Sequence, residues 1–274
     1  MSVRAIDCWV NVTMGEHAPP EYLVRVKEDY FKGGDEFFRN LEPQELVDQM
    51  DEAGVEKAVL TLDVRRPSKH ALAFASRFPE RCFFSANVAP TGRMDEVWEL
   101  EALVRNEPVV MARAVPFGTD TPPGHVRYVP LYVKCIELDL PLSINTGLPG
   151  PPVPGECQHP IHLDRVCVQF PELRLCMAHG ADPWWDVAIR LMIKYRNLHL
   201  MTSAYAPRYL PASLIHYMNT RGQEKILFAS DHPVLSFARC IGEAQQLDLR
   251  EGVLEKYLYG NAERLFFSER KPRN

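Results

Sequence analysis

The sequence has little excess charge of either sign and no long apolar run. Its 274 residues carry a formal net charge of −5, and without a basic run it has no electrostatic attraction to nucleic acid or to an anionic membrane. No apolar stretch approaches the roughly 18 residues that span a bilayer, and the first residues lack the features of a secretory signal. We therefore expect a cytoplasmic protein whose partner is a small molecule, with homodimer formation left open.

Disulfide bonds are also not expected. The seven cysteines are an odd number scattered along the chain, and a chain of this size does not need cross-links to be stable. With 46% hydrophobic residues it can bury a large core. The cysteines are therefore expected to be reduced and to serve as small core side chains.

Short runs of β-branched and apolar residues alternate with longer helical patterns, which is typical of parallel βα units. Several runs, such as 58–60 and 226–228, are apolar throughout, as expected for strands that are covered on both faces. The predicted strands span residues 3–12, 57–63, 82–90, 109–116, 141–147, 174–181, 198–204 and 225–233. The predicted helices span residues 44–53, 94–104, 128–138, 161–170, 184–195, 210–220 and 235–247.

Eight such units predict an α/β protein with one (β/α)8 TIM barrel over residues 1–274. An open Rossmann-type sheet is the alternative, but it normally carries a glycine-rich first turn, and none follows Val12. Two segments, 13–42 and 146–160, interrupt the alternation after the first and fifth strands. In a barrel such loop insertions lie on the C-terminal face, where active sites are found.

Polar residues near the carboxyl ends of the predicted strands are the first candidates for chemistry, because the top loops of a barrel form its pocket. His179 and Asp231 stand out, since each ends an otherwise apolar run. The other polar or aromatic residues at these ends are Asp7, Trp9, Asn11, Asp63, Arg65, Arg113, Asn145, Asp182, Ser203, Tyr205, Ser230 and His232.

These segments resemble the amidohydrolase-related (amidohydrolase 2) family, which includes aminocarboxymuconate-semialdehyde decarboxylase, related aromatic acid decarboxylases and a pyrone dicarboxylate lactonase. The resemblance covers nearly the whole chain. It is carried by IDCWVN at 6–11, FPEL at 170–173 with AHG at 178–180, Trp184 with Trp185, residues 200–204, LFASDHP at 227–233 and GNA at 260–262.

The chain departs from the family at the metal site. Members that bind a divalent metal carry a His-x-His pair on the first strand, a histidine on the fifth and an aspartate on the eighth, with a catalytic histidine on the sixth. Here the pair is replaced by Trp9 and Asn11, and the fifth-strand histidine by Asn145, while His179 and Asp231 are retained. Because Trp9 offers no ligand atom, we expect no cofactor; any bound metal would rest on His179 and Asp231.

The resemblance implies catalytic roles for His179 and Asp231. The alternatives are a histidine satisfied within the core and an aspartate that caps the next turn. His232 is a further pocket candidate, although neighbours on a strand point to opposite sides. Cys157, His159 and His162 have ligand-like spacing but no fourth partner, so ordinary loop and helix-start roles are favoured for them.

Substrate-binding candidates surround this pair. Arg65 and Arg113 have the guanidinium geometry that holds a carboxylate, although salt bridges at the barrel rim would explain them equally well. Trp9, Trp184 and Tyr205 are candidates for an aromatic wall, with ordinary packing as the alternative. Asn11 and Asn145 keep hydrogen-bonding ability without Lewis acidity.

The leading hypothesis is metal-independent hydrolysis of a lactone, ester or similar carbonyl of a small carboxylate. Asp231 would act as general base on water, and His179 with an asparagine would donate to the developing oxyanion. A decarboxylase or other carbon–carbon lyase is the second reading. A barrel that binds a ligand without catalysis is the third.

Overall fold

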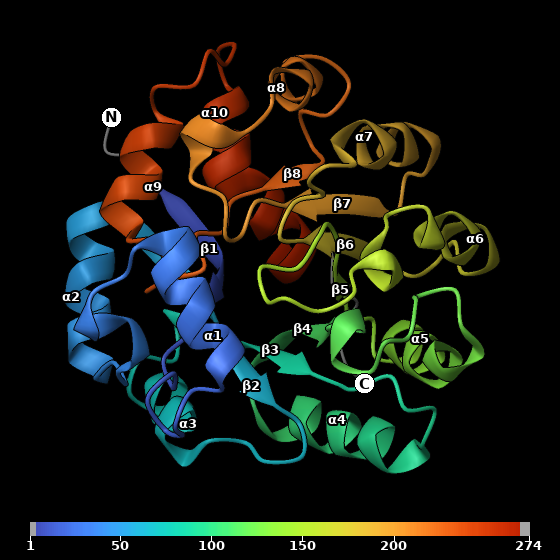
Figure 1. Ribbon diagram of the computed structural model, residues 1–274, viewed down its shortest axis with the longest axis horizontal. Coiled ribbons are helices and arrows are strands. Elements are labelled where there is room, and N and C mark those ends of the chain that lie inside the picture. Colours follow the sequence, from blue (N-terminus) through green and yellow to red (C-terminus); the bar gives the residue numbers. More distant parts are fainter. Residues whose placement is uncertain (1–3, 269–274) are drawn as a thin grey trace.

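The computed structural model describes residues 4–268, in which eight parallel strands form one sheet in the order β1 to β8 (Figure 1). The single-domain (β/α)8 prediction is confirmed. The predicted first residue of the first strand, Val3, lies outside the described residues. The strands are β1 Ala5–Val10, β2 Val55–Asp63, β3 Cys82–Asn87, β4 Val109–Ala114, β5 Leu142–Asn145, β6 Leu175–Ala178, β7 Leu198–Met201 and β8 Ile226–Leu227.

The first and last strands close the sheet into a barrel through contacts beyond the short ladder of β8. The Cys8 N–H donates to the Phe228 carbonyl at 3.2 Å, and the Asn11 N–H donates to the His232 carbonyl at 2.7 Å. In return, the Asp231 N–H donates to the Trp9 carbonyl at 3.1 Å. Closure therefore brings the predicted site residues of the two strands together.

Helices surround the strands (Figure 1), and most of them present one apolar stripe to the sheet; the first, Glu21–Arg25, has no buried residue. In α2 the buried residues include Leu46, Val47 and Met50, and Gly54 ends the helix with φ of 79°. The helices are α1 Glu21–Arg25, α2 Pro43–Ala53, α3 Lys69–Arg77, α4 Met94–Asn106, α5 Val129–Glu137, α6 His162–Gln169, α7 Trp185–Lys194, α8 Ala212–Met218, α9 Phe237–Ala244 and α10 Val253–Glu255.

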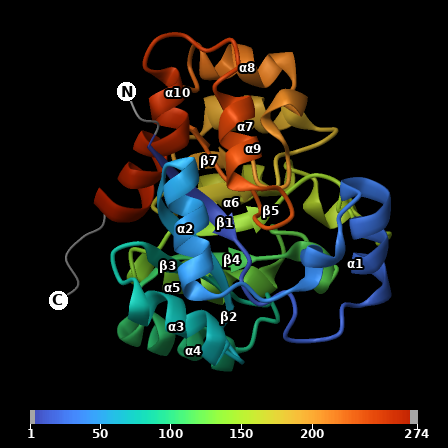
Figure 2. The same ribbon diagram turned by 90° about the vertical axis from the view of Figure 1, so that its left-hand side faces the viewer.

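The 13–42 insertion contains more structure than a loop: α1 continues into a π-helical turn at Val26–Phe31 and a 3-10 turn at Asp35–Phe38. Figure 2 shows α1 and the C-terminal helical segment at opposite ends of the barrel. A groove lined by Arg25, Val26, Tyr30 and residues 148–153 lies between the two insertions. Both insertions therefore meet at one end of the barrel.

Within the described residues, no helix is long and apolar enough to cross a membrane. The seven cysteines are all buried free thiols. Burial raises the pKa of each of these thiols, for example that of Cys157 to about 11, so the reduced, uncharged form is favoured.

Candidate active site

The site residues follow from the way in which the strands end. His179, Ala204 and Asp231 come just after β6, β7 and β8 and have φ angles of 61°, 66° and 68°. Side chains other than glycine rarely adopt this left-handed backbone, and such strained positions concentrate at functional sites. The chain thus turns sharply at both predicted catalytic residues as it leaves the barrel.

The Asp231 carboxylate is held by Asn11, whose side-chain amide donates to it at 2.8 Å. The Asn11 side-chain oxygen in turn accepts from the Thr61 hydroxyl at 3.1 Å. Burial raises the pKa of Asp231 to about 7, although the Asn11 hydrogen bond and the charge of Arg113 oppose the shift. Asp231 can therefore exchange a proton near neutral pH.

The His179 ring lies against the Trp9 indole, with ring centroids 4.3 Å apart. Its backbone N–H donates to the Ser203 hydroxyl at 3.0 Å. Burial, followed by the charge of Arg113, lowers the pKa of His179 to about 4. The imidazole is therefore neutral at pH 7, and its Nδ1 is buried without a hydrogen-bond partner among the described residues.

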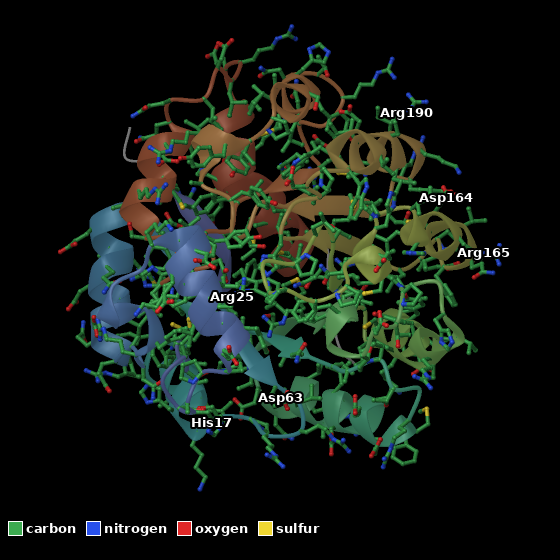
Figure 3. The ribbon with its side chains drawn as sticks, viewed as in Figure 1. His17, Arg25, Asp63, Asp164, Arg165 and Arg190 are labelled. Atoms are coloured by element: carbon green, nitrogen blue, oxygen red, sulfur yellow. The ribbon has the colours of Figure 1, made fainter. Side chains whose placement is uncertain are left out.

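The Arg113 guanidinium lies over Trp9, 4.3 Å from the ring centroid. Burial lowers the pKa of Arg113 to about 10, and the charges of Asp231 and Asp63 act in the opposite direction. Asp63 is exposed at the end of β2, and Figure 3 shows it at the edge of the barrel, with Arg25 on α1 in front of the strands. Arg113 remains a cation at neutral pH.

His179, Arg113 and Asp231 all retain part of their surface for solvent although burial dominates their pKa shifts. Each of these three side chains is therefore mostly enclosed by protein but still in partial contact with solvent. A cavity near Arg4 and Arg81 lies beside the strand starts and contains none of these three residues.

The sequence pattern marks Asp7 only as a polar residue on the first strand. Its fully buried carboxylate accepts from the Trp9 N–H at 3.0 Å and from the Ser230 N–H at 3.1 Å. Burial raises the pKa of Asp7 to about 7. Asp7 therefore positions two backbone segments, one carrying Trp9 and the other leading to Asp231. An acidic residue inside the apolar first strand was the signal for this role.

Two of the predicted substrate-binding residues, Arg65 and His232, make their contacts outside this site. The Arg65 guanidinium contacts Asp95 at 2.8 Å, Glu96 at 3.4 Å and Glu99 at 3.6 Å, which is the rim salt-bridge alternative. The His232 ring stacks on Phe237 of α9, with centroids 4.0 Å apart. Burial lowers the pKa of His232 to about 4, so this ring is neutral and packs between the barrel and its outer helices.

The remaining aromatic candidates pair with neighbours outside this cluster. Trp184 contacts the His159 ring, with centroids 4.3 Å apart, and Tyr205 contacts Trp185 at 5.2 Å. His159 and His162 also make local hydrogen bonds within their own loop. Asn145, in contrast, ends β5 with its side-chain oxygen buried and unpartnered among the described residues.

A carboxyl group, an imidazole and a cation thus gather around one indole at the carboxyl ends of the barrel strands, which is where candidate active sites of (β/α)8 proteins lie. The family model described as Amidohydrolase matches residues 6–267, and the chain belongs to that family. No curated protein sequence matches the chain.

Solved structures confirm the fold. An uncharacterized TIM-barrel protein from Bordetella bronchiseptica has a TM-score of 0.79 at 22% identity, with 96% of this chain and 98% of that chain covered. A 5-carboxyvanillate decarboxylase from Sphingomonas paucimobilis has a TM-score of 0.72 at 17% identity, with 97% and 99% covered. A dihydroxybenzoic acid decarboxylase from Polaromonas, with bound manganese and 2-nitroresorcinol, has a TM-score of 0.67 at 18% identity, with 98% of each chain covered.

The expectation of no cofactor is corrected by these structures, because decarboxylases crystallised with bound manganese are among the similar proteins. They point to a divalent metal as a cofactor of this structural group. In the described part of this chain, however, no three His, Cys, Asp or Glu side chains form a group that could hold a metal. The Asp231 carboxylate already accepts a hydrogen bond from Asn11, and the positive charge of Arg113 acts to lower its pKa. The described side chains do not fit such a metal site, and no step below is assigned to a metal.

Proposed function

We propose that this protein is a lyase that removes CO₂ from an aromatic carboxylic acid carrying a ring hydroxyl group. The observation that carries the proposal is the part-buried Asp231 carboxyl, which Asn11 holds beside Arg113 and the Trp9–His179 ring pair. Membership of the amidohydrolase family and the similarity to two aromatic acid decarboxylases support it. The sequence alone favoured hydrolysis, with a lyase as the alternative.

In the proposed reaction, the Asp231 carboxyl donates its proton to the ring carbon that bears the substrate carboxylate. The ring hydroxyl supplies electron density that makes this carbon basic enough to be protonated, and the protonated ring is then the electron sink for the bond that breaks. The bond to the carboxylate then breaks, its electron pair restores the aromatic ring, and CO₂ leaves. The Asp231 carboxylate recovers a proton from water.

His179 is suited to hold the ring hydroxyl during this step. Its imidazole is neutral, and Nδ1 has no hydrogen-bond partner among the described residues. A buried nitrogen of this kind binds a substrate hydroxyl more favourably than it remains unpaired. The face of Trp9 limits the orientation of the imidazole, so the hydrogen bond has a defined direction.

Hydrolysis of a lactone or ester is the second candidate. The pKa of Asp231, raised to about 7, favours it, because a carboxylate with this pKa can act as a general base on water near neutral pH. In this reaction Asp231 would remove a proton from water and return it to the leaving oxygen. A cytoplasmic location and homodimer formation remain predictions from the sequence.

The test is a panel of hydroxybenzoates, carboxylated phenols, lactones and esters, assayed chromatographically with and without manganese. The variant is Asp231→Asn, and the matched control is Asp48→Asn on the exposed surface of α2. We expect decarboxylation by the wild type and the control, and a loss of roughly 10²- to 10⁴-fold in Asp231→Asn. Full turnover by folded Asp231→Asn would remove this residue from the mechanism. Turnover of lactones alone would establish hydrolysis, and binding of acids without turnover would establish a non-catalytic barrel.

A further inference from the structure

The side-chain oxygen of Asn145 is a hydrogen-bond acceptor that the protein leaves unused. Asn145 ends β5, is 4% exposed, and its Oδ1 is buried without a partner in residues 4–268. Two polar residues lie on the same face of the neighbouring ladder: Ser143, two positions earlier on β5, and its β4 partner Arg113. Ser143 Oγ and Arg113 Nε are themselves unpartnered in that part of the chain, so neither satisfies the Asn145 oxygen. A donor supplied by a ligand would therefore pair a costly buried acceptor.

Asn145 faces the interior of the barrel next to His179. Ile144 packs in the large core cluster that the helices share with the strands, and successive residues of a strand point to opposite faces. The partner of Asn145 in the β5–β6 ladder is Ala178, which offers only a methyl group, and His179 is the next residue. Because neighbouring strands lie about 4.8 Å apart, the amide and the imidazole stand side by side at the mouth of the barrel.

A hydroxyl group is the ligand that fits this pair of side chains. Asn145 Oδ1 can only accept a hydrogen bond, because an amide oxygen carries no proton. His179 Nδ1 is likewise buried without a partner among the described residues, and an imidazole nitrogen can carry a proton and donate it. A hydroxyl accepts from the imidazole and donates to the amide at the same time. A phenolate or a methoxy group has no proton to give to Asn145.

We propose that Asn145 is a specificity-determining residue that accepts a hydrogen bond from the ring hydroxyl of the substrate, while His179 Nδ1 donates to the same hydroxyl. The hydroxyl is therefore bound in its neutral form. A methoxy group in its place leaves the Asn145 oxygen buried and unpaired, and a site of this kind discriminates strongly against such an analogue. This inference rests on the proposed function for the hydroxylated aromatic class of substrate. The two unpartnered atoms do not depend on it.

The test measures binding separately from turnover. The ligands para-nitrophenol and para-nitroanisole differ in whether the oxygen carries a proton or a methyl group, and neither has a carboxylate to lose. Calorimetry gives both affinities, with chelator and again with manganese. We expect para-nitrophenol to bind the wild type roughly 10-fold or more tightly than para-nitroanisole in both conditions, as one buried hydrogen bond implies.

Absorption spectra report which form of the nitrophenol binds, because its phenolate absorbs visible light and its neutral form does not. At a pH where half of the free ligand is ionised, the visible absorption should fall as wild-type protein is added. A rise in this absorption, with or without manganese, would show that the phenolate is bound and would overturn the inference.

The variants separate a hydrogen bond from a simple limit on size. Asn145→Leu is close in shape but has no acceptor, so it should lose both the preference for para-nitrophenol and the absorption change. Asn145→Asp keeps an acceptor oxygen and should retain the preference. The matched control is Asn87→Leu, at the end of β3, which should behave as the wild type.

Thermal melts identify any variant that does not fold; if Asn145→Leu fails, the absorption change of the wild type and the preference of Asn145→Asp decide. Equal affinities in the wild type, or a preference that persists in folded Asn145→Leu, would overturn the inference. An Asn145-dependent preference without release of CO₂ from any hydroxybenzoate would leave the hydroxyl site standing and refute the proposed function. Release of CO₂ by the wild type with an unchanged preference in Asn145→Leu would do the reverse.

Discussion

The Asp7→Asn substitution should lower the free energy of unfolding at pH 4 and raise it at pH 8, relative to the wild type. Asp7 is fully buried, and its pKa rises from 3.8 to about 7 in the folded state. The folded state therefore binds this proton more tightly than the unfolded chain. The contribution of Asp7 to folding stability is most favourable below about pH 3.8 and declines as the pH rises towards 7.

The size of the change follows from the shift. One pKa unit corresponds to about 1.4 kcal/mol, so the ionised carboxylate costs roughly 4 kcal/mol of folding free energy at pH 8. Asparagine avoids this cost. It retains one oxygen for the Trp9 and Ser230 N–H groups but replaces the second oxygen that Ser230 uses, a loss of about 1–3 kcal/mol.

Asp7→Asn should therefore be less stable than the wild type at pH 4 by roughly 1–3 kcal/mol and more stable by a similar amount at pH 8. Denaturant unfolding followed by circular dichroism at constant ionic strength measures this crossover. In melts it corresponds to a relative shift of roughly 10 °C for a domain of this size. Asp48→Asn, at an exposed position, controls for loss of a surface charge. A difference between Asp7→Asn and the wild type that does not vary with pH would refute the reasoning.

Three further outcomes are expected. The decarboxylation rate should fall as the pH rises above about 7, because the Asp231 carboxyl loses the proton it donates; a rate that increases through pH 8 would contradict a proton donor with this pKa. His179→Gln should lower kcat by roughly 10-fold or more while the melting temperature changes little, since a hydrogen-bonding side chain remains in place; steady-state kinetics with melts measure both. Gly180→Ala should destabilise the protein by roughly 2 kcal/mol or more, because a Cβ there would lie 2.3 Å from the Trp185 ring and φ is 63°; an unchanged denaturation midpoint would contradict this packing.

The strands could be predicted because both faces of a parallel barrel are buried, which leaves apolar runs in the sequence. The eighth strand was predicted as 225–233, whereas the ladder covers only Ile226–Leu227. The left-handed turn at Asp231 breaks the regular pattern there. Helix α3 was not predicted, since its buried stripe consists of Phe74 with Ala71 and Ala75, which gives a weak hydrophobic period.

The positions of the site residues were predictable from strand ends, but their contacts were not. Arg65 and Arg113 are equivalent in sequence terms, and what separates them is the placement of α4. This helix brings Asp95, Glu96 and Glu99 to Arg65 and leaves Arg113 facing Trp9. Such choices depend on distances between elements that are remote in the chain, which a single sequence does not contain.

Closure of the barrel also has a consequence for the order in which the protein folds. Asp7 lies in β1 and Asn11 directly follows it, whereas their partners Ser230, Asp231 and His232 come after β8, more than 200 residues later. Contacts of such high sequence separation are costly to form early. The middle strands pair with strands that are close in sequence, so they can assemble before β1 and β8 meet. The candidate active site should therefore form only in the last folding step. Hydrogen exchange pulsed during refolding would then show protection at Met111 and Ile144 before protection at Asn11 and Asp231. The reverse order would mean that the seam between the first and last strands nucleates the barrel.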